Sequence, residues 1–361
     1  MNDALLATVG NPSSMHQEGQ AARRLVDRAR QQVATFLNAE TSDIVFTGGG
    51  TEADNLAILG VARALAPSRG TIVTTAVEHH AVLSPCEHLR EAGRTVVVLP
   101  VDGDGRIDGK ALVQSAGPDV ALYSVMLANN DTGVVSPLGE VVATAKSCGA
   151  FVHTDAVQAA GRWPLDVKAL GVDLLSLSAH KLCGPKGVGA LYVRRGVPMV
   201  PLAFGGKQEK SLRPGTENLL GIVGLGHACA LAVSRQAADR AHLQSLRDGF
   251  EARILAGVSG ARVNGAGDRL PNTSNLSFAG MDGEAILVNL DLLGVSVSLG
   301  SACSSASKDP SHVLLAMGRT EQEARSSVRF SFGRTQSMAD VERAVAAVTS
   351  AISLLGGAVH G

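Results

Sequence analysis

Short apolar runs rich in β-branched residues recur along the first half of the chain, separated by polar and glycine-containing stretches. They read DIVFT, TIVTTA, TVVVLPV, DVALYSV, AFVHT, VDLLSLS and GALYVR between residues 43 and 194. Helical patterns such as LAILGVARAL and LGEVVATAKSCG lie between several of them. Near-continuous apolar strands that alternate with helices are typical of an α/β domain with a mostly parallel sheet. We therefore predict a seven-stranded, mostly parallel sheet in a large domain over residues 11–233.

The pattern changes near residue 234. Two long helical patterns, 235–256 and 340–355, flank the strand-like runs NTSNLSFAG and SVRFSFG. These patterns predict a smaller α+β domain over residues 234–361. At the other end of the chain, apolar side chains recur at helical spacing over residues 14–37, which predicts an amphipathic helix there.

Composition narrows the classes of function. The 361 residues are 45% apolar and carry a formal net charge of −1, which gives no electrostatic reason to expect nucleic acid as a direct partner. No run approaches the roughly 18 to 20 apolar residues of a membrane span, and the N-terminus lacks a secretory pattern. The five cysteines are widely spaced and contain no CxxC pair, so we expect no metal site, no disulfide framework and a cytoplasmic protein.

Segments that follow the strands are where site residues are expected, because ligands of parallel α/β sheets bind outside the carboxyl ends of the strands. After the first strand, FTGGGTEADN opens a helix. Thr51 and Asp54 match a capping box, and the glycines up to Gly50 let backbone amides approach an anion at the helix start. From this motif alone, a capped turn and an anion site both stay open.

The second and fourth strands are followed by imidazoles and amides. His79 lies where a strand gives way to a helix, a place suited to stacking on a planar ring. His80 beside it leaves the choice of ring open, as does a purely structural histidine. Asn129 and Asn130 follow the fourth strand, either as turn formers or as ligands.

The fifth and sixth strands end in a carboxylate and an amine. Asp155 and Gln158 follow the fifth strand, and Asp155 is either a helix N-cap or a partner for a ring N–H⁺. Ser178, His180 and Lys181 end the sixth strand. Lysine is almost never fully buried unless it is paired, so Lys181 is either leaving the core or held there for chemistry. An anion cradle, a stacking histidine, an aspartate and a lysine at one sheet edge together predict pyridoxal 5′-phosphate (PLP).

Segments spread over most of the chain resemble one known family. They are GGGTEADNLAILG, VEHHAVL, NNDTGVVSPLGEV, HTDAVQAAG, SLSAHKLCGPKGVGALYVR, LRPGTENLLGIVGLG, GSACSSASKDPSHVL and SVRFSFGR. In order and spacing, over residues 11–334, they are similar to the PLP-dependent cysteine desulfurases of the class V aminotransferases. The resemblance implies the PLP-dependent transferase fold type I and an enzyme that converts L-cysteine to L-alanine.

The resemblance also implies a role for each candidate residue of the large domain. Lys181 would carry the cofactor and move the substrate's α-proton. Asp155 would pair with the ring nitrogen and Gln158 with the ring oxygen, while His79 would stack on the ring and act as an acid/base. The cofactor phosphate would be held by Gly50, Thr51, Ser178, His180 and, from the neighbouring subunit of a homodimer, Thr216.

The resemblance implies that Asn130 and Arg329 bind the substrate carboxylate. It also implies that Asn130 contacts the cofactor. The planar guanidinium fork of Arg329 suits a carboxylate, although a surface position on its strand stays open. Cys303 lies in VSLGSACSSASKDPSH, which is small, polar and poorly suited to a core, so an exposed thiol is expected. By the resemblance it would take sulfur from the substrate as a persulfide and pass it to a sulfur-acceptor protein, for iron–sulfur assembly or tRNA thiolation.

The chain departs from the family at its start. Family members usually begin with a strand and a turn ahead of GNPSS, and here that segment is expected to be missing. Because of this departure, a second function stays open, in which the chain is a PLP-binding scaffold that depends on a partner protein or has little activity. A selenocysteine lyase and an aminotransferase also stay open as functions, although an aminotransferase has no need for the Cys303 thiol.

Overall fold

The structure is a computed structural model that describes residues 1, 4–5, 10–66, 68–300 and 309–359. The chain divides into two compact units. The first comprises residues 1–99, 109–127 and 137–236, and the second comprises residues 100–108, 128–136 and 237–361. The sequence predicts a single division at residue 233/234, whereas two short segments that follow strands of the first unit also belong to the second. Asn130 therefore lies in the second unit and not in the predicted large domain.

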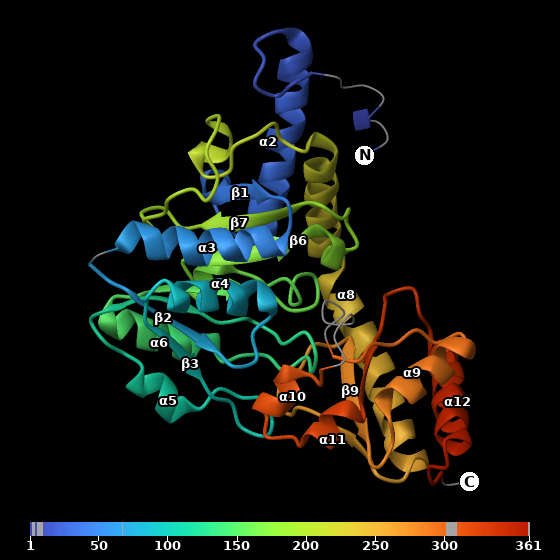
Figure 1. The fold of residues 1–361 in the computed structure, drawn as a ribbon. Helices are drawn as coiled ribbons and strands as arrows, with labels where there is room; N and C mark the ends of the chain where they lie inside the picture. Colours follow the sequence, from blue (N-terminus) through green and yellow to red (C-terminus); the bar gives the residue numbers. More distant parts are fainter. Residues whose placement is uncertain (2–3, 6–9, 67, 301–308, 360–361) are drawn as a thin grey trace. The chain divides into compact units, whose positions relative to one another are not determined.

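The first unit is built around a seven-stranded sheet (Figure 1). Its strands are β1 (Ile44–Thr47), β2 (Thr71–Thr75), β3 (Val96–Leu99), β4 (Val120–Ser124), β5 (Phe151–Asp155), β6 (Leu174–Ser178) and β7 (Gly189–Val193). They lie in the order β1-β7-β6-β5-β4-β2-β3. β7 is antiparallel to both of its neighbours, and all other pairs are parallel. The predicted seven-stranded, mostly parallel sheet is confirmed.

Helices cover this sheet and complete the core of the first unit. They are α2 (Gln17–Leu37), α3 (Gly50–Leu65), α4 (His80–Glu91), α5 (Gly109–Gln114), α6 (Leu138–Cys148) and α7 (Val167–Leu170), with the 3-10 turns η1 (Thr41–Asp43), η2 (Ala179–Leu182) and η3 (Gln208–Ser211). α3 contacts strands β1, β4, β5, β6 and β7. Its apolar side chains Leu56 and Ile58 pack in one buried cluster with Leu122 and Leu174 of the sheet. This packing fixes the start of α3 beside the strand ends.

Helix α8 (Leu219–Gly257) begins well before the predicted start at residue 235. The glycines of LLGIVGLG weaken helix propensity and hid this part of the helix. Their absent side chains have a packing role, because a Cβ at Gly226 would lie 2.7 Å from the Ala29 Cα on α2. The apolar first half also gives α8 the length and composition of a membrane span, so the prediction that no segment approaches one was too strong. Buried side chains such as Leu225 and Cys229 show that the same composition serves a packed helix.

The second unit has a three-stranded antiparallel sheet in the order β10-β9-β8. The strands are β8 (Ala261–Val263), β9 (Thr273–Phe278) and β10 (Ser327–Ser331), and its helices are α9 (Gly283–Leu292), α10 (His312–Ala316), α11 (Glu321–Arg325) and α12 (Met338–Leu354). Phe250 of α8, Phe278 and Phe330 pack in its buried core with residues of α9 and α12. β9 and β10 were predicted from the sequence, and β8 was not. The α+β character of this part of the chain is as predicted.

Candidate active site

Four of the segments that follow strands begin at one edge of the first unit's sheet. β1, β2, β5 and β6 all run in the same direction, because β1 and β6 are both antiparallel to β7. The residues after them are therefore neighbours at the carboxyl edge, where α/β proteins bind ligands. We call the predicted residues at this edge the cofactor cluster: Gly50, Thr51, His79, Asp155, Gln158, Ser178, His180 and Lys181.

A hollow of about 730 Å³ lies at the start of α3. It is lined by Gly48, Gly49, Gly50, Thr51, Glu52, Asn55, Ser178, His180, Lys186 and Gly187. The predicted capping box is wrong: the N-cap is Gly49, which has no side chain, and Thr51 lies inside the helix. Instead, the Glu52 carboxylate accepts the N–H of Gly48 at 2.7 Å. The helix start thus keeps its first N–H groups and its positive dipole end for an anion.

The chemistry of the hollow fits a phosphate group. The Ser178 hydroxyl lies 2.9 Å from Nδ1 of His180, and the Lys186 side chain adds a positive charge. Burial, with the charges of Lys181 and Lys186, lowers the pKa of His180, so its imidazole is neutral at pH 7. A Cβ at Gly50 would lie 2.7 Å from Cγ2 of Val157, which makes glycine necessary for this close approach. Lys186 was not predicted; only its place in the glycine-rich GPKG turn could have indicated it.

Asp155 and Lys181 occupy the ends of adjacent strands β5 and β6. Asp155 is buried at 7% exposure, and the Val157 N–H donates to its Oδ1 at 2.8 Å. Burial raises the pKa of Asp155 to about 6, while that hydrogen bond and the nearby Lys181 charge act in the opposite direction. Turns, not a helix, follow Asp155, so the interpretation as a helix N-cap is wrong. The Lys181 side chain is half-buried and interacts electrostatically with this carboxylate.

A buried polar layer that the sequence reasoning missed lies behind Asp155. The His153 ring is held between two hydroxyls, with Nδ1 2.8 Å from Ser124 Oγ and Nε2 2.9 Å from Ser176 Oγ. Its Nε2 also lies 3.5 Å from Oδ1 of Asp54 in α3. Burial lowers the pKa of His153 to about 3 and, with the charge of Asp155 as the second cause, raises the pKa of Asp54 well above its usual value. His153 is therefore neutral at pH 7, and burial favours the protonated form of Asp54.

Glu78 is the third buried carboxyl group of this layer. It accepts hydrogen bonds from Thr75 Oγ1 at 2.7 Å and from the Met126 N–H at 2.9 Å. Burial nevertheless raises the pKa of Glu78 to about 8. With a pKa of about 6, Asp155 is mainly ionised at neutral pH, whereas Glu78, with a pKa of about 8, is not. This ionisation suits Asp155 to a cationic ring N–H.

His79 and Gln158 also lie at this edge of the sheet. His79 is the N-cap of α4, where its Nδ1 accepts the N–H of Ala81 at 3.0 Å, so the proton of the neutral ring is on Nε2. His79 is half-buried and His80 is exposed, which favours His79 as the ring beside a ligand. Gln158 is half-buried in the turn after β5, and its backbone carbonyl accepts a hydrogen bond from Arg162 at 3.0 Å.

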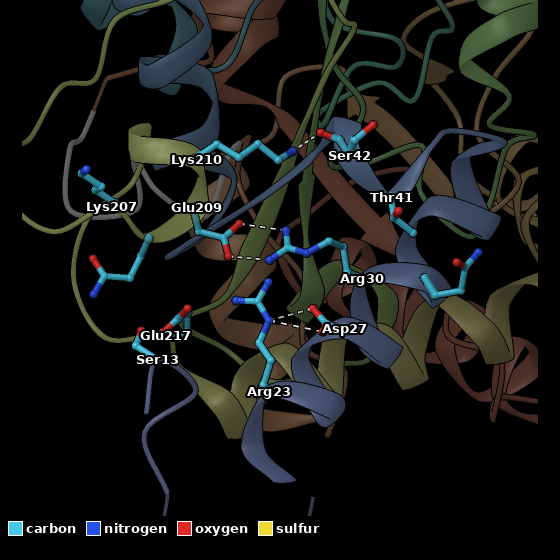
Figure 2. A pocket seen from close by; sticks show the side chains of 12 residues that line it. Ser13, Arg23, Asp27, Arg30, Thr41, Ser42, Lys207, Glu209, Lys210 and Glu217 are labelled. Carbon is cyan, nitrogen blue, oxygen red and sulfur yellow. Dashed lines mark hydrogen bonds and ion pairs between the residues drawn. The ribbon is translucent and has the colours of Figure 1, made fainter. Parts of the chain in front are cut away.

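Thr216 is exposed and does not line the hollow at the start of α3. Its segment instead borders a second hollow of about 930 Å³ beside α2 (Figure 2). Within that hollow, Arg30 donates to both carboxylate oxygens of Glu209 at 2.9 and 2.6 Å. This buried pair holds the loop that carries Thr216 against α2.

The residues predicted to bind the substrate carboxylate lie in the second unit. Arg329 of β10 donates from Nη1 to the Asn130 carbonyl at 2.9 Å, and its side chain is only 13% exposed, so a surface position is wrong. Asn130 donates from Nδ2 to Asp131 Oδ1 at 2.7 Å. Oδ1 of Asn130 is buried without a hydrogen-bond partner among the described residues. Asn129 is the turn former, since its Oδ1 accepts the N–H groups of Asp131 and Thr132. We call Asn130, Asp131 and Arg329 the carboxylate cluster.

Cys303 lies outside the described residues, within 301–308. The other four cysteines are free thiols: Cys86 and Cys229 are buried, Cys148 is half-buried and Cys183 is exposed. Burial raises the pKa of Cys86 and Cys229 to about 12, which leaves both thiols protonated and unreactive. The described residues contain no group of three metal-ligating side chains.

Comparison with known proteins gives this geometry a family. The model of the class-V aminotransferases matches residues 1–344. The chain belongs to this family. Cysteine desulfurase IscS of Dictyoglomus turgidum is 46% identical over 334 residues, which cover 92% of this chain and 85% of that protein. Within the class-V aminotransferases the chain is thus an enzyme of the cysteine desulfurase kind.

Solved structures agree with this assignment. A NifS-like protein superposes with a TM-score of 0.92 at 34% identity, covering 98% of this chain and 94% of that one. SspA in complex with cysteine superposes with a TM-score of 0.81 at 33% identity, covering 93% and 94%. The predicted fold class is confirmed, and the family to which the chain belongs is PLP-dependent.

Proposed function

We propose that this desulfurase binds PLP at the cofactor cluster and releases sulfur from L-cysteine. The observation that carries the proposal is the position of Lys181, in the turn after β6, near the buried Asp155 at the end of the adjacent β5 and near a hollow that fits phosphate. The Lys181 charge acts to lower the pKa of Asp155. When bound, PLP supplies an electron sink for bonds at the substrate's α-carbon. The residues that would hold its phosphate are Gly50, Thr51, Ser178, His180 and Lys186.

The remaining cluster residues orient the ring and move protons. Asp155 holds the proton of the ring nitrogen, and Gln158 donates to the ring oxygen. His79 covers the ring face and takes the proton of the substrate thiol at Nδ1, which gives up its hydrogen bond from the Ala81 N–H in that step. Lys181 supplies the amine that carries the cofactor and later shuttles the substrate's α-proton. These roles need a half-buried amine near a carboxylate, which is what Lys181 and Asp155 provide.

The carboxylate cluster and Cys303 supply the substrate side of the reaction. Arg329 and Asn130 bind the substrate carboxylate, for which an arginine fork is well shaped. The Cys303 thiolate attacks the substrate sulfur. The carbon–sulfur bond breaks, its electron pair returns to carbon, and protonation there gives alanine and a persulfide on Cys303.

The assembly and the destination of the sulfur form part of the proposal. The exposed Thr216 reaches the phosphate of a partner subunit, which makes the working unit a homodimer. The persulfide passes to a sulfur-acceptor protein for iron–sulfur assembly or tRNA thiolation. We place this chemistry in the cytoplasm, since the four described cysteines are free thiols, which a reducing compartment preserves.

The test is a product assay on the cofactor-loaded protein. With L-cysteine and a reductant, we expect sulfide and alanine in equal amounts, and no sulfide from Cys303→Ser although that variant keeps its cofactor absorbance. Cys183→Ser is the matched control, because it removes another exposed thiol. Sulfide release that survives Cys303→Ser, or that disappears in Cys183→Ser, contradicts the proposal.

A further inference from the structure

Asp131 is a buried carboxylate at the centre of the second unit's polar contacts. It is 1% exposed, and both of its oxygens have named partners. Oδ1 accepts from Asn130 Nδ2 at 2.7 Å and lies 3.6 Å from Nη1 of Arg329. Oδ2 accepts from the Ser311 hydroxyl at 2.7 Å. One carboxylate thus contacts both predicted substrate-binding residues and a third segment of the chain.

The residues on both sides of 301–308 converge on this carboxylate. Ser311 lies after that segment, and Gly300 lies before it. A Cβ at Gly300 would be 3.3 Å from Oδ2 of Asp131 and equally close to Cβ of Ser311. Two residues earlier, the Ser298 N–H donates to the Arg329 carbonyl at 3.2 Å and the Arg329 N–H donates to the Ser298 carbonyl at 2.8 Å. The segment before residue 301 is therefore hydrogen-bonded to Arg329 through Ser298. The segment after residue 308 is hydrogen-bonded to Asp131 through Ser311.

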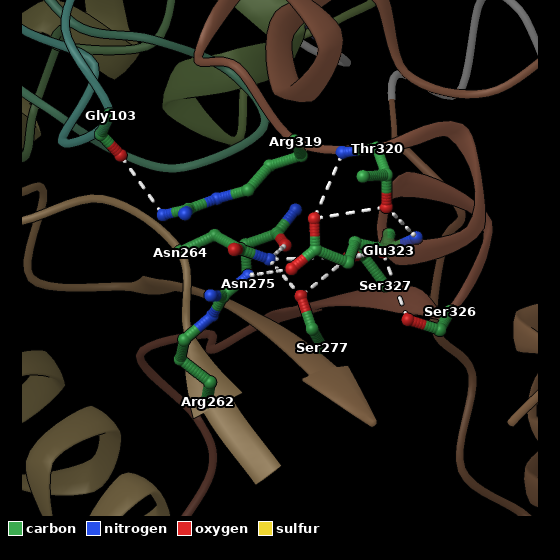
Figure 3. A network of polar contacts seen from close by, with 10 residues as sticks. All are labelled: Gly103, Arg262, Asn264, Asn275, Ser277, Arg319, Thr320, Glu323, Ser326 and Ser327. Atoms are coloured by element: carbon green, nitrogen blue, oxygen red, sulfur yellow. Dashed lines mark hydrogen bonds and ion pairs between the residues drawn. The ribbon is translucent and has the colours of Figure 1, made fainter. Parts of the chain in front are cut away.

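The buried side-chain amides of Asn275 and Asn264 hold the backbone at Asp131 in place. Nδ2 of Asn275, on β9, donates to the Asp131 carbonyl at 3.3 Å. Asn275 accepts in turn from Nδ2 of Asn264 at 2.8 Å, and Asn264 also donates to Ser277 (Figure 3). Asn264 and Asn275 are fully buried. A buried, hydrogen-bonded amide network gives the Asp131 turn one defined position.

We infer that Asp131 is a positioning residue whose buried carboxylate orients Arg329 and ties it to both flanks of the Cys303 segment. The inference rests on the proposed roles of Arg329 and Cys303. Arg329 can bind a substrate carboxylate only when its guanidinium is held in place, and the Asn130 carbonyl and the Asp131 carboxylate hold it from Nη1. The same contact couples the substrate-binding arginine to the ends of the segment that carries the nucleophile.

The experiment compares Asp131→Asn with Glu251→Gln in the holoenzyme. Glu251 is the matched control, because it is a buried carboxylate of the same unit that pairs with Arg269 at 2.7 and 2.8 Å and lies outside both clusters. We expect Asp131→Asn to raise the KM for L-cysteine and lower kcat/KM by about 10- to 100-fold, since misplacement by an ångström can have that effect. Glu251→Gln should leave KM unchanged. Equal KM values for the two variants overturn the inference.

A double-mutant cycle separates positioning from a merely structural role. If Asp131 acts through Arg329, Asp131→Asn should have little further effect on KM in an Arg329→Gln background. Full additivity of the two substitutions contradicts the inference.

A second readout does not depend on turnover. In the cofactor-free protein, the rate at which iodoacetamide alkylates Cys303, followed by peptide mass mapping, should rise in Asp131→Asn and in Ser311→Ala but not in Glu251→Gln. Ser311→Ala should leave the KM unchanged, because it spares Arg329. An unchanged alkylation rate in both variants refutes the link to the Cys303 flanks. If the wild type releases no Cys303-dependent sulfide, the proposed function fails, and the alkylation rates still test Asp131.

Discussion

The cofactor cluster and the carboxylate cluster are built in different ways. The cofactor cluster comes from strands whose shared direction delivers Gly50, His79, Asp155 and Lys181 to one sheet edge. The carboxylate cluster comes from a turn after β4 and from β10, almost two hundred residues later, joined through the buried Asp131. The first follows from local pattern and topology, whereas the second depends on long-range pairing that pattern does not encode. The comparison suggests that the first cluster decides whether cofactor binds and the second decides which substrate is held.

The largest effect is expected at the cofactor cluster. Lys181→Ala removes the amine that carries the cofactor and moves a proton, so sulfide production should fall by more than about 10²-fold and the absorbance of bound cofactor should be lost. Sulfide assays and the visible spectrum of the purified protein measure the two effects. Lys186→Ala is the control, since it removes a nearby charge but not this amine; it should weaken cofactor binding and leave turnover of the loaded protein intact. Normal turnover in Lys181→Ala would refute the role of the cluster.

The next largest effect is expected at the carboxylate cluster, and it should change substrate binding without changing cofactor binding. Arg329→Lys keeps the charge but loses the planar fork, and this exchange is not conservative at a carboxylate site. We expect kcat/KM for L-cysteine to fall by about 30-fold or more, mostly through KM, because the lysine ammonium cannot make the second charge-assisted hydrogen bond of the fork, which contributes about 1.5–3 kcal/mol. Cofactor affinity should not change. A weakened cofactor affinity with normal KM would erase the distinction between the clusters.

Asp155 predicts a pH dependence with two opposite signs. Its pKa is raised to about 6 in the folded protein, so the folded state binds more protons than the unfolded state between the ordinary carboxyl pKa and pH 6. The free energy of unfolding of the cofactor-free protein should therefore fall as pH rises through this window. Cofactor affinity should rise over the same window, because Asp155 becomes ionised and can hold the ring N–H⁺.

Asp155→Asn is the control for this pH dependence, since it cannot titrate. Urea unfolding and cofactor titration at pH 4.5 to 7.5, read as the difference between wild type and variant, isolate the contribution of Asp155 from those of Asp54 and Glu78. Identical pH profiles for wild type and variant would contradict the prediction.

The smallest effect is expected in the polar layer behind Asp155. Burial raises the pKa of Asp54 and so favours its neutral form, which Asp54→Asn replaces by a neutral group of similar shape. The free energy of unfolding should change by less than about 1.5 kcal/mol. Asp54→Ala, which removes the contact with His153, should cost more. Urea unfolding of both variants at pH 7 measures this order, and a larger loss in Asp54→Asn would show that Asp54 is ionised.

The sequence predicts that the residues of the cofactor cluster lie at one sheet edge, because each lies at or just after the end of an apolar strand, where a polar or glycine residue stands out. It misplaces the cap of α3, because three glycines before Thr51 are compatible with both a capped turn and an open anion cradle. The structure distinguishes them, since the N-cap is Gly49 and Thr51 lies inside the helix. The sequence does not reveal the start of α8, because its glycines lower the predicted helix propensity. The sequence alone cannot show that one of them, Gly226, makes room for the packing of α2.

The sequence does not predict the polar residues that act from inside the fold. Asp54 lies within an apolar helix, and His153 lies within a strand, so each reads as part of its element and not as part of a layer behind Asp155. Asp131 reads as one more turn residue in NNDTG. Its contact with Ser311 spans 180 positions, and no local pattern indicates such a pairing.

One measurement tests the central claim that a lysine-bound cofactor site and the Cys303 thiol act on the same molecule of L-cysteine. The cofactor-loaded protein is mixed with L-cysteine without reductant. The mass of each cysteine-containing peptide is then measured by mass spectrometry, and the alanine released is quantified. We predict one added sulfur atom on the Cys303 peptide for each alanine released. Alanine without sulfur on Cys303, or sulfur on Cys183 instead, would contradict the account.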